Sequence, residues 1–134
     1  MGQRDTILIV DDMEVNRAIL HGVFETQYNL LEAENGEQAL LLLEEYHGQI
    51  AALLLDLMMP VMNGYQVMEE MRERGEFTDV PVVVITAEDS VEHEVRAFDL
   101  GASDIVKKPF EPHVVKRRIQ NIFELNLHRL NQEE

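Results

Sequence analysis

The sequence predicts an α/β fold built on a parallel sheet. Two observations lead to this prediction: segments typical of strands alternate with helical segments five times, and some of the strand segments are apolar throughout. Alternation of this kind is typical of right-handed β–α–β units. The chain has 134 residues and no internal repeat. It is therefore expected to form one domain around a single core.

The strands are predicted from short apolar runs rich in Val, Ile and Leu. Five segments fit this description: 6–10, 29–33, 50–55, 81–85 and 103–106. The runs at 50–55 and 81–85 contain almost no polar residue, which indicates strands that are buried on both faces.

The helices are predicted from apolar residues that recur at helical spacing. They are the stretch that carries Val15, Ile19 and Val23, then 37–46, 64–74, 90–100 and the chain from Pro112 onward. Asn35 and Gly36 mark the start of the second helix. Gly101 suits the position just beyond the end of the fourth.

The charge is strongly acidic and unevenly distributed. The formal net charge is −15, with −17 over residues 1–106 and +2 over residues 107–134. An acidic body argues against nucleic acid or an anionic membrane surface as a direct partner. The sequence has no cysteine, no apolar run long enough to span a membrane and no signal peptide before the first strand. Cytoplasmic localisation is therefore expected.

Chemically versatile residues follow four of the predicted strands. Asp11 and Asp12 follow the first strand, Asp56 the third, Thr86 ends the fourth, and Lys108 follows the fifth. Each of them alone has a simpler explanation, such as helix capping or a surface lysine. Parallel strands, however, bring their carboxyl ends to one edge of the sheet, where ligand sites form. The joint pattern therefore predicts one functional site.

The predicted cluster suits phosphoryl transfer. Three neighbouring carboxylates repel one another, and Mg²⁺ relieves this repulsion with oxygen ligands. An ionised aspartate can attack phosphorus and form an aspartyl-phosphate, while Mg²⁺ and an ammonium group neutralise the phosphoryl oxygens. Asp56 is the best nucleophile candidate, because a central strand delivers it between the Asp pair and Lys108.

Four motifs resemble those of response regulator receiver domains of two-component signal transduction. They are ILIVDD (7–12), LLLDLMMPVMNG (53–64), VVVITA (82–87) and GASDIVKKPF (101–110). The resemblance covers about residues 5–125, which leaves 126–134 as a C-terminal helical extension. It implies a doubly wound, flavodoxin-like (βα)5 sandwich with strand order 2-1-3-4-5.

The resemblance also implies a role for each site residue. Asp56 resembles the phosphoacceptor, Thr86 the residue that moves toward the phosphate, and Lys108 the lysine that contacts it. The Lys108–Pro109 bond is expected to be cis, as X–Pro bonds permit. The implied Mg²⁺ ligands are Asp11, Asp12, Asp56 and the backbone carbonyl of Met58.

The implied function is a phosphorylation-dependent signalling switch. The phosphoryl donor would be a sensor histidine kinase or a phosphotransfer protein, and the conformational change would lie near Thr86 and the helix at 90–100. Such a protein is not an enzyme in the usual sense, because it catalyses only its own phosphorylation and dephosphorylation. A homodimer is expected through the helix at 90–100, the strand at 103–106 and the final helix.

The final helix carries a further expectation. Its apolar residues recur at helical spacing: Ile119, Phe123, Leu127 and Leu130. The later part extends past the usual end of the family domain. Three interpretations of this later part are open: the frayed end of a lone domain, a dimer seam, or a connector to an output domain.

Three positions depart from the family pattern or tune it. Ile105 stands where the family often has Tyr or Phe, which predicts a muted or differently built output face. Met58 and Glu88 occupy positions that affect phosphate lifetime, with opposing expected effects. Five histidines are interpreted as surface or boundary residues: His21, His47, His93, His113 and His128.

Three other functions are alternatives to the switch. A haloacid-dehalogenase-like phosphatase would place its nucleophile after the first strand in an Asp-x-Asp pattern, but Met13 lies two residues past Asp11. A flavodoxin-like nucleotide binder would need a Gly/Ser/Thr-rich loop there. A receiver-like scaffold that is never phosphorylated stays an alternative.

Overall fold

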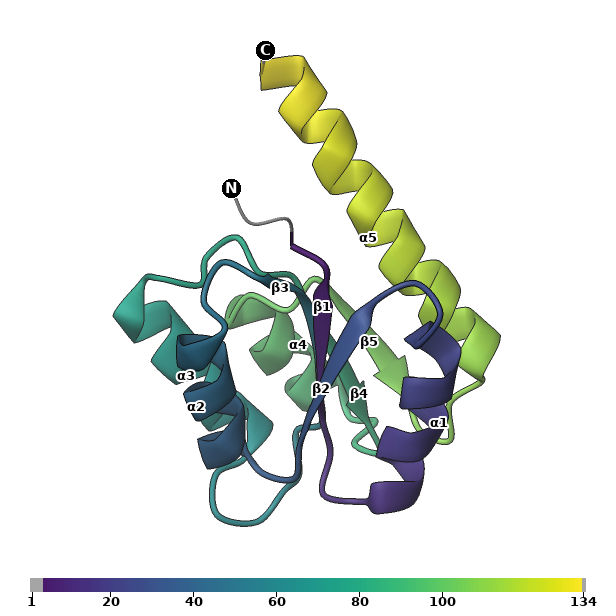
Figure 1. Cartoon of the computed structure of the whole chain (residues 1–134). Helices are drawn as coiled ribbons and strands as arrows, with labels where there is room; N and C mark the ends of the chain where they lie inside the picture. Colours follow the sequence, from purple (N-terminus) through teal and green to yellow (C-terminus); the bar gives the residue numbers. More distant parts are fainter. Residues whose placement is uncertain (1–3, 134) are drawn as a thin grey trace.

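A five-stranded parallel sheet forms the centre of the protein (Figure 1). The computed structural model describes the backbone of residues 4–133 and the side chains of residues 4–125. The strands are β1 (Thr6–Val10), β2 (Asn29–Ala33), β3 (Ile50–Leu55), β4 (Val82–Thr86) and β5 (Asp104–Lys107). Their order is β2-β1-β3-β4-β5, and every neighbouring pair is parallel. The predicted fold class and strand order are confirmed.

Helices cover both faces of the sheet. They are α1 (Glu14–Phe24), α2 (Gly36–Glu45), α3 (Gly64–Arg74), α4 (Val91–Asp99) and α5 (Pro112–Glu133). Figure 1 shows α1 and α5 on one face and α2, α3 and α4 on the other. This arrangement is the doubly wound sandwich that right-handed crossovers produce.

The central strands supply residues to both faces, which explains their apolar sequences. In β1, Ile7 and Ile9 pack in the cluster under α1 and α5, whereas Leu8 and Val10 pack in the cluster under α2 and α3. All four are fully buried or nearly so. Successive side chains of a strand point to opposite faces, so a strand covered on both sides needs apolar residues at every position.

Two helices bury different residues from those that the apolar spacing suggested. In α1 the buried residues are Leu20 and Phe24, while Val15 and Ile19 are exposed. In α4 only Ala97 is buried, and the predicted apolar stripe is exposed: Val91, Val95 and Phe98. The spacing predicted the helices correctly, but it did not show which face of each helix meets the sheet.

Helix α5 begins against the sheet and continues beyond it (Figure 1). Val115 and Ile119 are buried under the sheet, and Phe123 is half-buried. The side chains of Leu127, Leu130 and His128 lie outside the described residues, so the role of the extension at 126–134 stays a prediction. Among the described helices, none is both long and apolar enough to cross a membrane.

Candidate functional site

The first two site residues sit in the turn between β1 and α1. The backbone N–H of Asp11 donates to the Ala33 carbonyl at 3.1 Å, which extends the pairing of β1 with β2 by one residue. The Asp11 side chain then accepts a hydrogen bond from the Met13 N–H at 2.9 Å. Asp11 is only 2% exposed, whereas Asp12 is exposed to solvent. The turn thus buries one carboxylate and presents the other.

Asp56 occupies the equivalent place after β3. Its N–H donates to the Val10 carbonyl at 3.0 Å, so its backbone is aligned with the end of β1. Asp56 is 5% exposed, and its side chain accepts a hydrogen bond from the Met58 N–H at 3.3 Å. Gly64, the first residue of α3, donates its N–H to the Leu57 carbonyl at 2.9 Å. This hydrogen bond holds the start of α3 next to Asp56.

Lys108 joins the two buried carboxylates. Its Nζ lies 2.8 Å from Asp11 Oδ2 and 2.9 Å from Asp56 Oδ2. The Lys108 backbone N–H donates to the Thr86 carbonyl at 2.9 Å, and the Lys108–Pro109 peptide bond is cis, as expected. One ammonium group thus bridges residues that follow three different strands.

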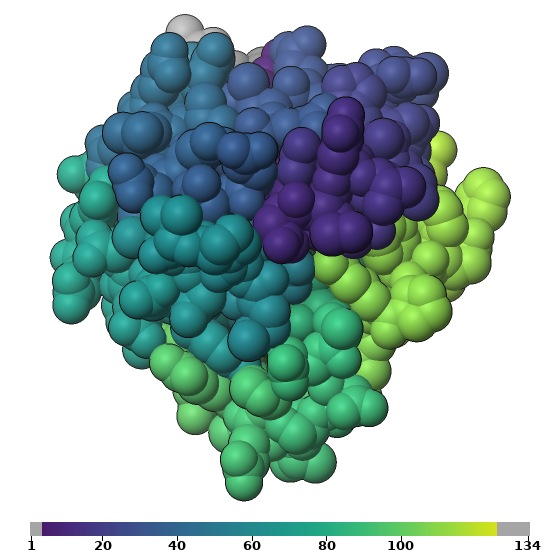
Figure 2. Space-filling view, turned by 90° about the horizontal axis from the view of Figure 1, so that it is seen from below, coloured from purple at the N-terminus to yellow at the C-terminus, as the bar shows by residue number. Residues whose placement is uncertain are grey.

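The three aspartates form a compact acidic cluster. Asp11, Asp12 and Asp56 each offer a carboxylate oxygen, and these oxygens lie within 4.8 Å of one another. A set of carboxylate oxygens that is partly open to water suits Mg²⁺, which keeps several waters in proteins. The residues present therefore fit the expected ion. Figure 2 shows this edge of the molecule, where the segments that follow β1 (purple), β3 (teal), β4 (green) and β5 (yellow-green) meet.

Burial and charge shift the ionisation of the two central groups. Burial raises the pKa of Asp56, and Asp11 adds to this effect, while the hydrogen bond and charge of Lys108 oppose it. Burial alone would lower the pKa of Lys108, but its contacts with Asp11 and Asp56 outweigh burial and raise it. Lys108 therefore stays a cation at neutral pH, and Asp56 loses its proton less readily than an ordinary aspartate.

Thr86 and Ile105 lie on adjacent strands near the same edge. Thr86 is 1% exposed, ends β4 and accepts a hydrogen bond from the Glu88 N–H at 3.2 Å. Ile105 of β5 pairs with Val84 and is half-buried. Its side chain packs against the cluster under α2 and α3.

Two features near the site were not anticipated from the sequence. Arg17 donates to the Asp11 carbonyl at 2.7 Å and to Glu32 at 3.1 Å, which ties the turn after β1 to β2. His93 of α4 contacts both Tyr65 and Glu88. Arg17 lies near the start of α1, only six residues after Asp11, so its closeness to the turn could have been anticipated. Contacts between residues of two separate helices leave no comparable signal in one sequence.

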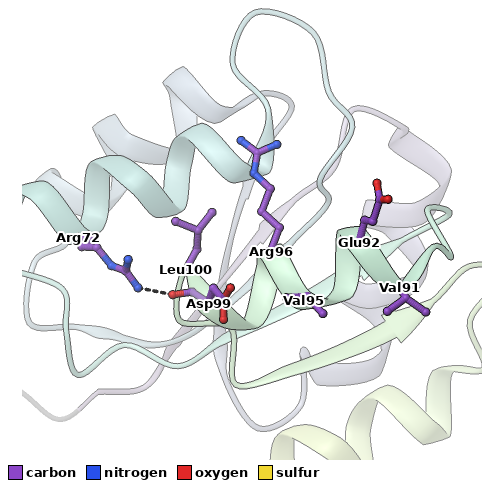
Figure 3. Close-up of a pocket in the computed structure, with 7 residues that line it drawn as sticks. All are labelled: Arg72, Val91, Glu92, Val95, Arg96, Asp99 and Leu100. Carbon is purple, nitrogen blue, oxygen red and sulfur yellow. Dashed lines mark hydrogen bonds between the residues drawn. The ribbon is translucent and has the colours of Figure 1, made fainter.

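The groove between α3 and α4 is separate from the acidic cluster (Figure 3). Its lining residues are Arg72, Val91, Glu92, Val95, Arg96, Asp99 and Leu100. The Arg72 guanidinium donates to the Asp99 carbonyl across it. None of the predicted site residues contributes to this groove.

The sheet order and the helices on both faces define a CheY-like, doubly wound α/β fold. The family described as the response regulator receiver domain matches residues 7–120. The chain belongs to this family, and the resemblance seen in the motifs is confirmed.

The relatives and solved structures agree with this assignment. The chain is 34% identical over 125 residues to the "Probable transcriptional regulator ycf27" of Porphyridium aerugineum. The matched region covers 90% of this chain and 48% of that protein. It is 35% identical over 114 residues to the "Transcriptional regulatory protein CiaR" of Streptococcus pneumoniae, with 85% and 49% covered. The chain thus spans about half the length of these relatives. A receiver domain protein from Methanospirillum hungatei has the same fold, with a TM-score of 0.83, 22% identity and 95% and 99% of the two chains covered.

Proposed function

We propose that the protein is a switch that is phosphorylated on Asp56. The observation that carries this proposal is the Lys108 ammonium, which lies within 3 Å of Asp56 and Asp11 inside a compact carboxylate cluster. Mg²⁺ would be held by Asp11, Asp12, Asp56 and the backbone carbonyl of Met58. The phosphoryl donor would be the phosphohistidine of a sensor kinase or a phosphotransfer protein.

The chemistry follows from the positions of these groups. An Asp56 carboxylate oxygen attacks phosphorus, a P–O bond forms, and the P–N bond to the donor histidine breaks, with the electron pair leaving on the donor nitrogen. Lys108 stabilises the negative charge on the phosphoryl oxygens from one side. When bound, Mg²⁺ neutralises charge on the same oxygens. The chain itself thus supplies the nucleophile, its placement and one of the two cations.

Thr86 links the modification to a change in shape. Thr86 is the last residue of β4, and its carbonyl accepts a hydrogen bond from the Lys108 backbone N–H. A phosphoryl group on Asp56 offers three strong acceptor oxygens. The Thr86 hydroxyl donates to one of them, and the population shifts toward a conformation in which the loop before α4 has moved.

The output surface follows as part of the same proposal. The elements α4, β5 and α5 carry the exposed apolar residues Val95 and Phe98 and an ion pair between Asp104 and Arg118 at 2.9 Å. A second copy of the chain would dimerise through this surface. Ile105 lies in it without the phenol or ring of the usual aromatic residue, and we expect a muted output face for that reason.

Two other parts of the proposal concern context. The relatives are about twice as long as this chain, so α5 is proposed as the connector to an output domain. The strongly acidic body supports a protein partner rather than direct contact with nucleic acid or a membrane, and cytoplasmic localisation is proposed with it.

Incubation with acetyl phosphate and Mg²⁺, followed by intact-mass spectrometry, tests the proposal. The wild-type protein should gain one phosphate, and the gain should disappear in Asp56→Asn and when Mg²⁺ is chelated. Asp89→Asn is the matched control, because Asp89 is an exposed aspartate of the loop after β4 and should leave the gain unchanged.

Three results would contradict the proposal. Phosphate uptake that persists in Asp56→Asn would move the reaction to another residue. A wild-type protein that takes up no phosphate would favour the scaffold that is never phosphorylated, and steady hydrolysis of unrelated phosphate esters would favour a phosphatase.

A further inference from the structure

Tyr65, His93 and Glu88 form a chain of contacts between α3, α4 and the loop after β4. The Tyr65 hydroxyl contacts His93 Nδ1, and His93 Nε2 lies 3.1 Å from Glu88 Oε2. The planes of the two rings are also nearly parallel, 17° apart, with centroids 5.9 Å apart. Helix α3 is thereby joined at one point to α4 and to the loop that precedes α4.

Hydrogen-bond chemistry fixes the direction of this chain. The Glu88 carboxylate can only accept, so His93 Nε2 must carry the hydrogen. In a neutral ring Nδ1 then accepts, and the Tyr65 hydroxyl donates to it. Burial raises the pKa of Tyr65, and the nearby Glu88 adds to this against the opposing charge of Arg96, so the hydroxyl keeps its proton. One tautomer of His93 therefore satisfies all three side chains.

Arg96 contacts the face of the Tyr65 ring. The Arg96 guanidinium carbon lies 3.9 Å from the centre of the Tyr65 ring, and the same guanidinium pairs with Glu69 of α3 at 3.3 Å. Figure 3 shows Arg96 pointing away from Val91 and Val95. The cation–π contact and the hydroxyl contact with His93 together restrict the movement of Tyr65.

Both ends of the chain of contacts are attached to the phosphorylation site. At one end, the Glu88 N–H donates to the Thr86 hydroxyl oxygen at 3.2 Å. At the other end, Tyr65 follows Gly64, whose N–H donates to the carbonyl of Leu57, the neighbour of Asp56. A movement of Thr86 toward Asp56 would therefore either break the Glu88 N–H contact or draw Glu88 with it, and His93 holds the Glu88 carboxylate.

We propose that His93 is a positioning residue that holds Glu88, and with it the loop after Thr86, in the unphosphorylated arrangement. The inference rests on the proposed function, because it describes how strongly the same site resists switching. His93 and Glu88 are each about one-third exposed, at 34% and 35% of their side chains. A hydrogen bond between groups of this exposure contributes modestly, so loss of the contact should change the switching equilibrium about two- to fivefold.

Titration with beryllofluoride and Mg²⁺, a mimic of the phosphoryl group, tests this role. The amide NMR signals of Thr86 and Glu88 report the fraction converted. His93→Leu should reach half-conversion at a beryllofluoride concentration about two- to fivefold lower than wild type. Tyr65→Phe keeps the ring under Arg96 but loses the hydroxyl, and it should shift the midpoint in the same direction by less.

Two further variants separate positioning from general loosening. In His93→Gln the side-chain amide can still donate to Glu88, so the midpoint should return toward that of wild type. His113→Leu removes an exposed histidine of α5 and should leave the midpoint unchanged.

The ring nitrogens of His93 give a measurement that needs no variant. In the free wild-type protein, ¹⁵N NMR should show hydrogen on Nε2 of His93, and beryllofluoride should change the nitrogen shifts of this ring. Unchanged His93 nitrogen shifts, or equal midpoints for His93→Leu and wild type, would overturn the positioning role while leaving the proposed function intact. A wild-type protein that responds to beryllofluoride no more than Asp56→Asn does would overturn both.

Discussion

Asp56 is placed where the fold opposes its ionisation. The carboxylate is nearly fully buried and faces Asp11, while Lys108 provides the compensating charge. The pKa of Asp56 stays raised despite that compensation, because burial is the largest influence on it. A buried charge that is retained in this way costs stability and indicates a functional role.

Asp56→Asn should therefore stabilise the protein when Mg²⁺ is absent. A raised pKa in the folded state means that Asp56 contributes stability below its unfolded-state pKa and loses this contribution as the pH rises through the folded-state value. The variant should be more stable at pH 7 by about 1 kcal/mol. Its advantage should shrink as the pH falls toward the ordinary aspartate range near 4. Urea denaturation in EDTA, at several pH values, measures the difference.

Asp89→Asn serves again as the control, since it removes an exposed aspartate and should change the free energy of unfolding little. A variant at Asp56 that is less stable than wild type at pH 7 would show that the Lys108 contact outweighs burial.

Single residues at the strand ends could be predicted from the sequence, whereas contacts across helices could not. Asp11, Asp56 and Lys108 follow runs that read as buried strands, and the topology of a parallel sheet then brings them together. The pairing of Tyr65 with His93 depends on how α3 and α4 are rotated and spaced. No local pattern in the chain encodes that geometry.

At the scale of elements, the start of α3 is the part of the fold that fits most closely against the site. Asn63 caps the helix by accepting from the Gln66 N–H, and the Gln66 side chain accepts from the Asn63 N–H in return. A Cβ on Gly64 would collide with the Asp56 carbonyl oxygen and lie 2.9 Å from the Leu57 Cα. Backbone atoms cannot yield as a flexible side chain does, so only glycine fits there.

Gly64→Ala should destabilise the protein by about 2–3 kcal/mol, the usual cost of forcing an extra group into a packed site. It should also slow phosphorylation, because the backbone of Asp56 must shift. Gly22→Ala is the matched control in α1, where an added Cβ has nothing within 4 Å. That change should stabilise by about 0.5–1 kcal/mol through helix propensity. Chemical denaturation of both variants measures the contrast, and equal effects would contradict this packing argument.

The first and last residues of some helices and strands could be predicted from the sequence. The strand at 6–10 and the helix at 64–74 have the predicted ends. The fourth strand starts one residue late, at Val82, because Pro81 has no N–H to donate to a neighbouring strand. The outward faces of α1 and α4 were not predictable, since helical spacing marks an apolar face without identifying what covers it.

At the scale of the whole molecule, the fold brings negative charges together in a chain that is already strongly acidic. The fold gathers three aspartates at one edge of a chain whose net charge is already −15. Self-repulsion of this size weakens the compact state, and salt screens it. A cation bound at the carboxylates would add to this general screening.

Mg²⁺ should therefore raise the melting temperature more than NaCl at the same ionic strength. Binding at about ten to a hundred times the dissociation constant adds about 1.4–2.7 kcal/mol, which corresponds to several degrees for a domain of this size. Calorimetry in the two salts measures the difference. Asp12→Asn alters an exposed site residue and should abolish most of it. Equal melting temperatures in the two salts would contradict a specific divalent-cation site.

The position of Lys108 affects how tightly the aspartate cluster binds cations. Its ammonium is shared by Asp11 and Asp56, so these carboxylates have a counterion that the chain itself supplies. Any cation that reaches them takes part in an exchange of ion pairs, and its net affinity is the difference between pairs gained and pairs lost. Such a difference is small compared with either contribution, which favours rapid, reversible occupancy over permanent retention.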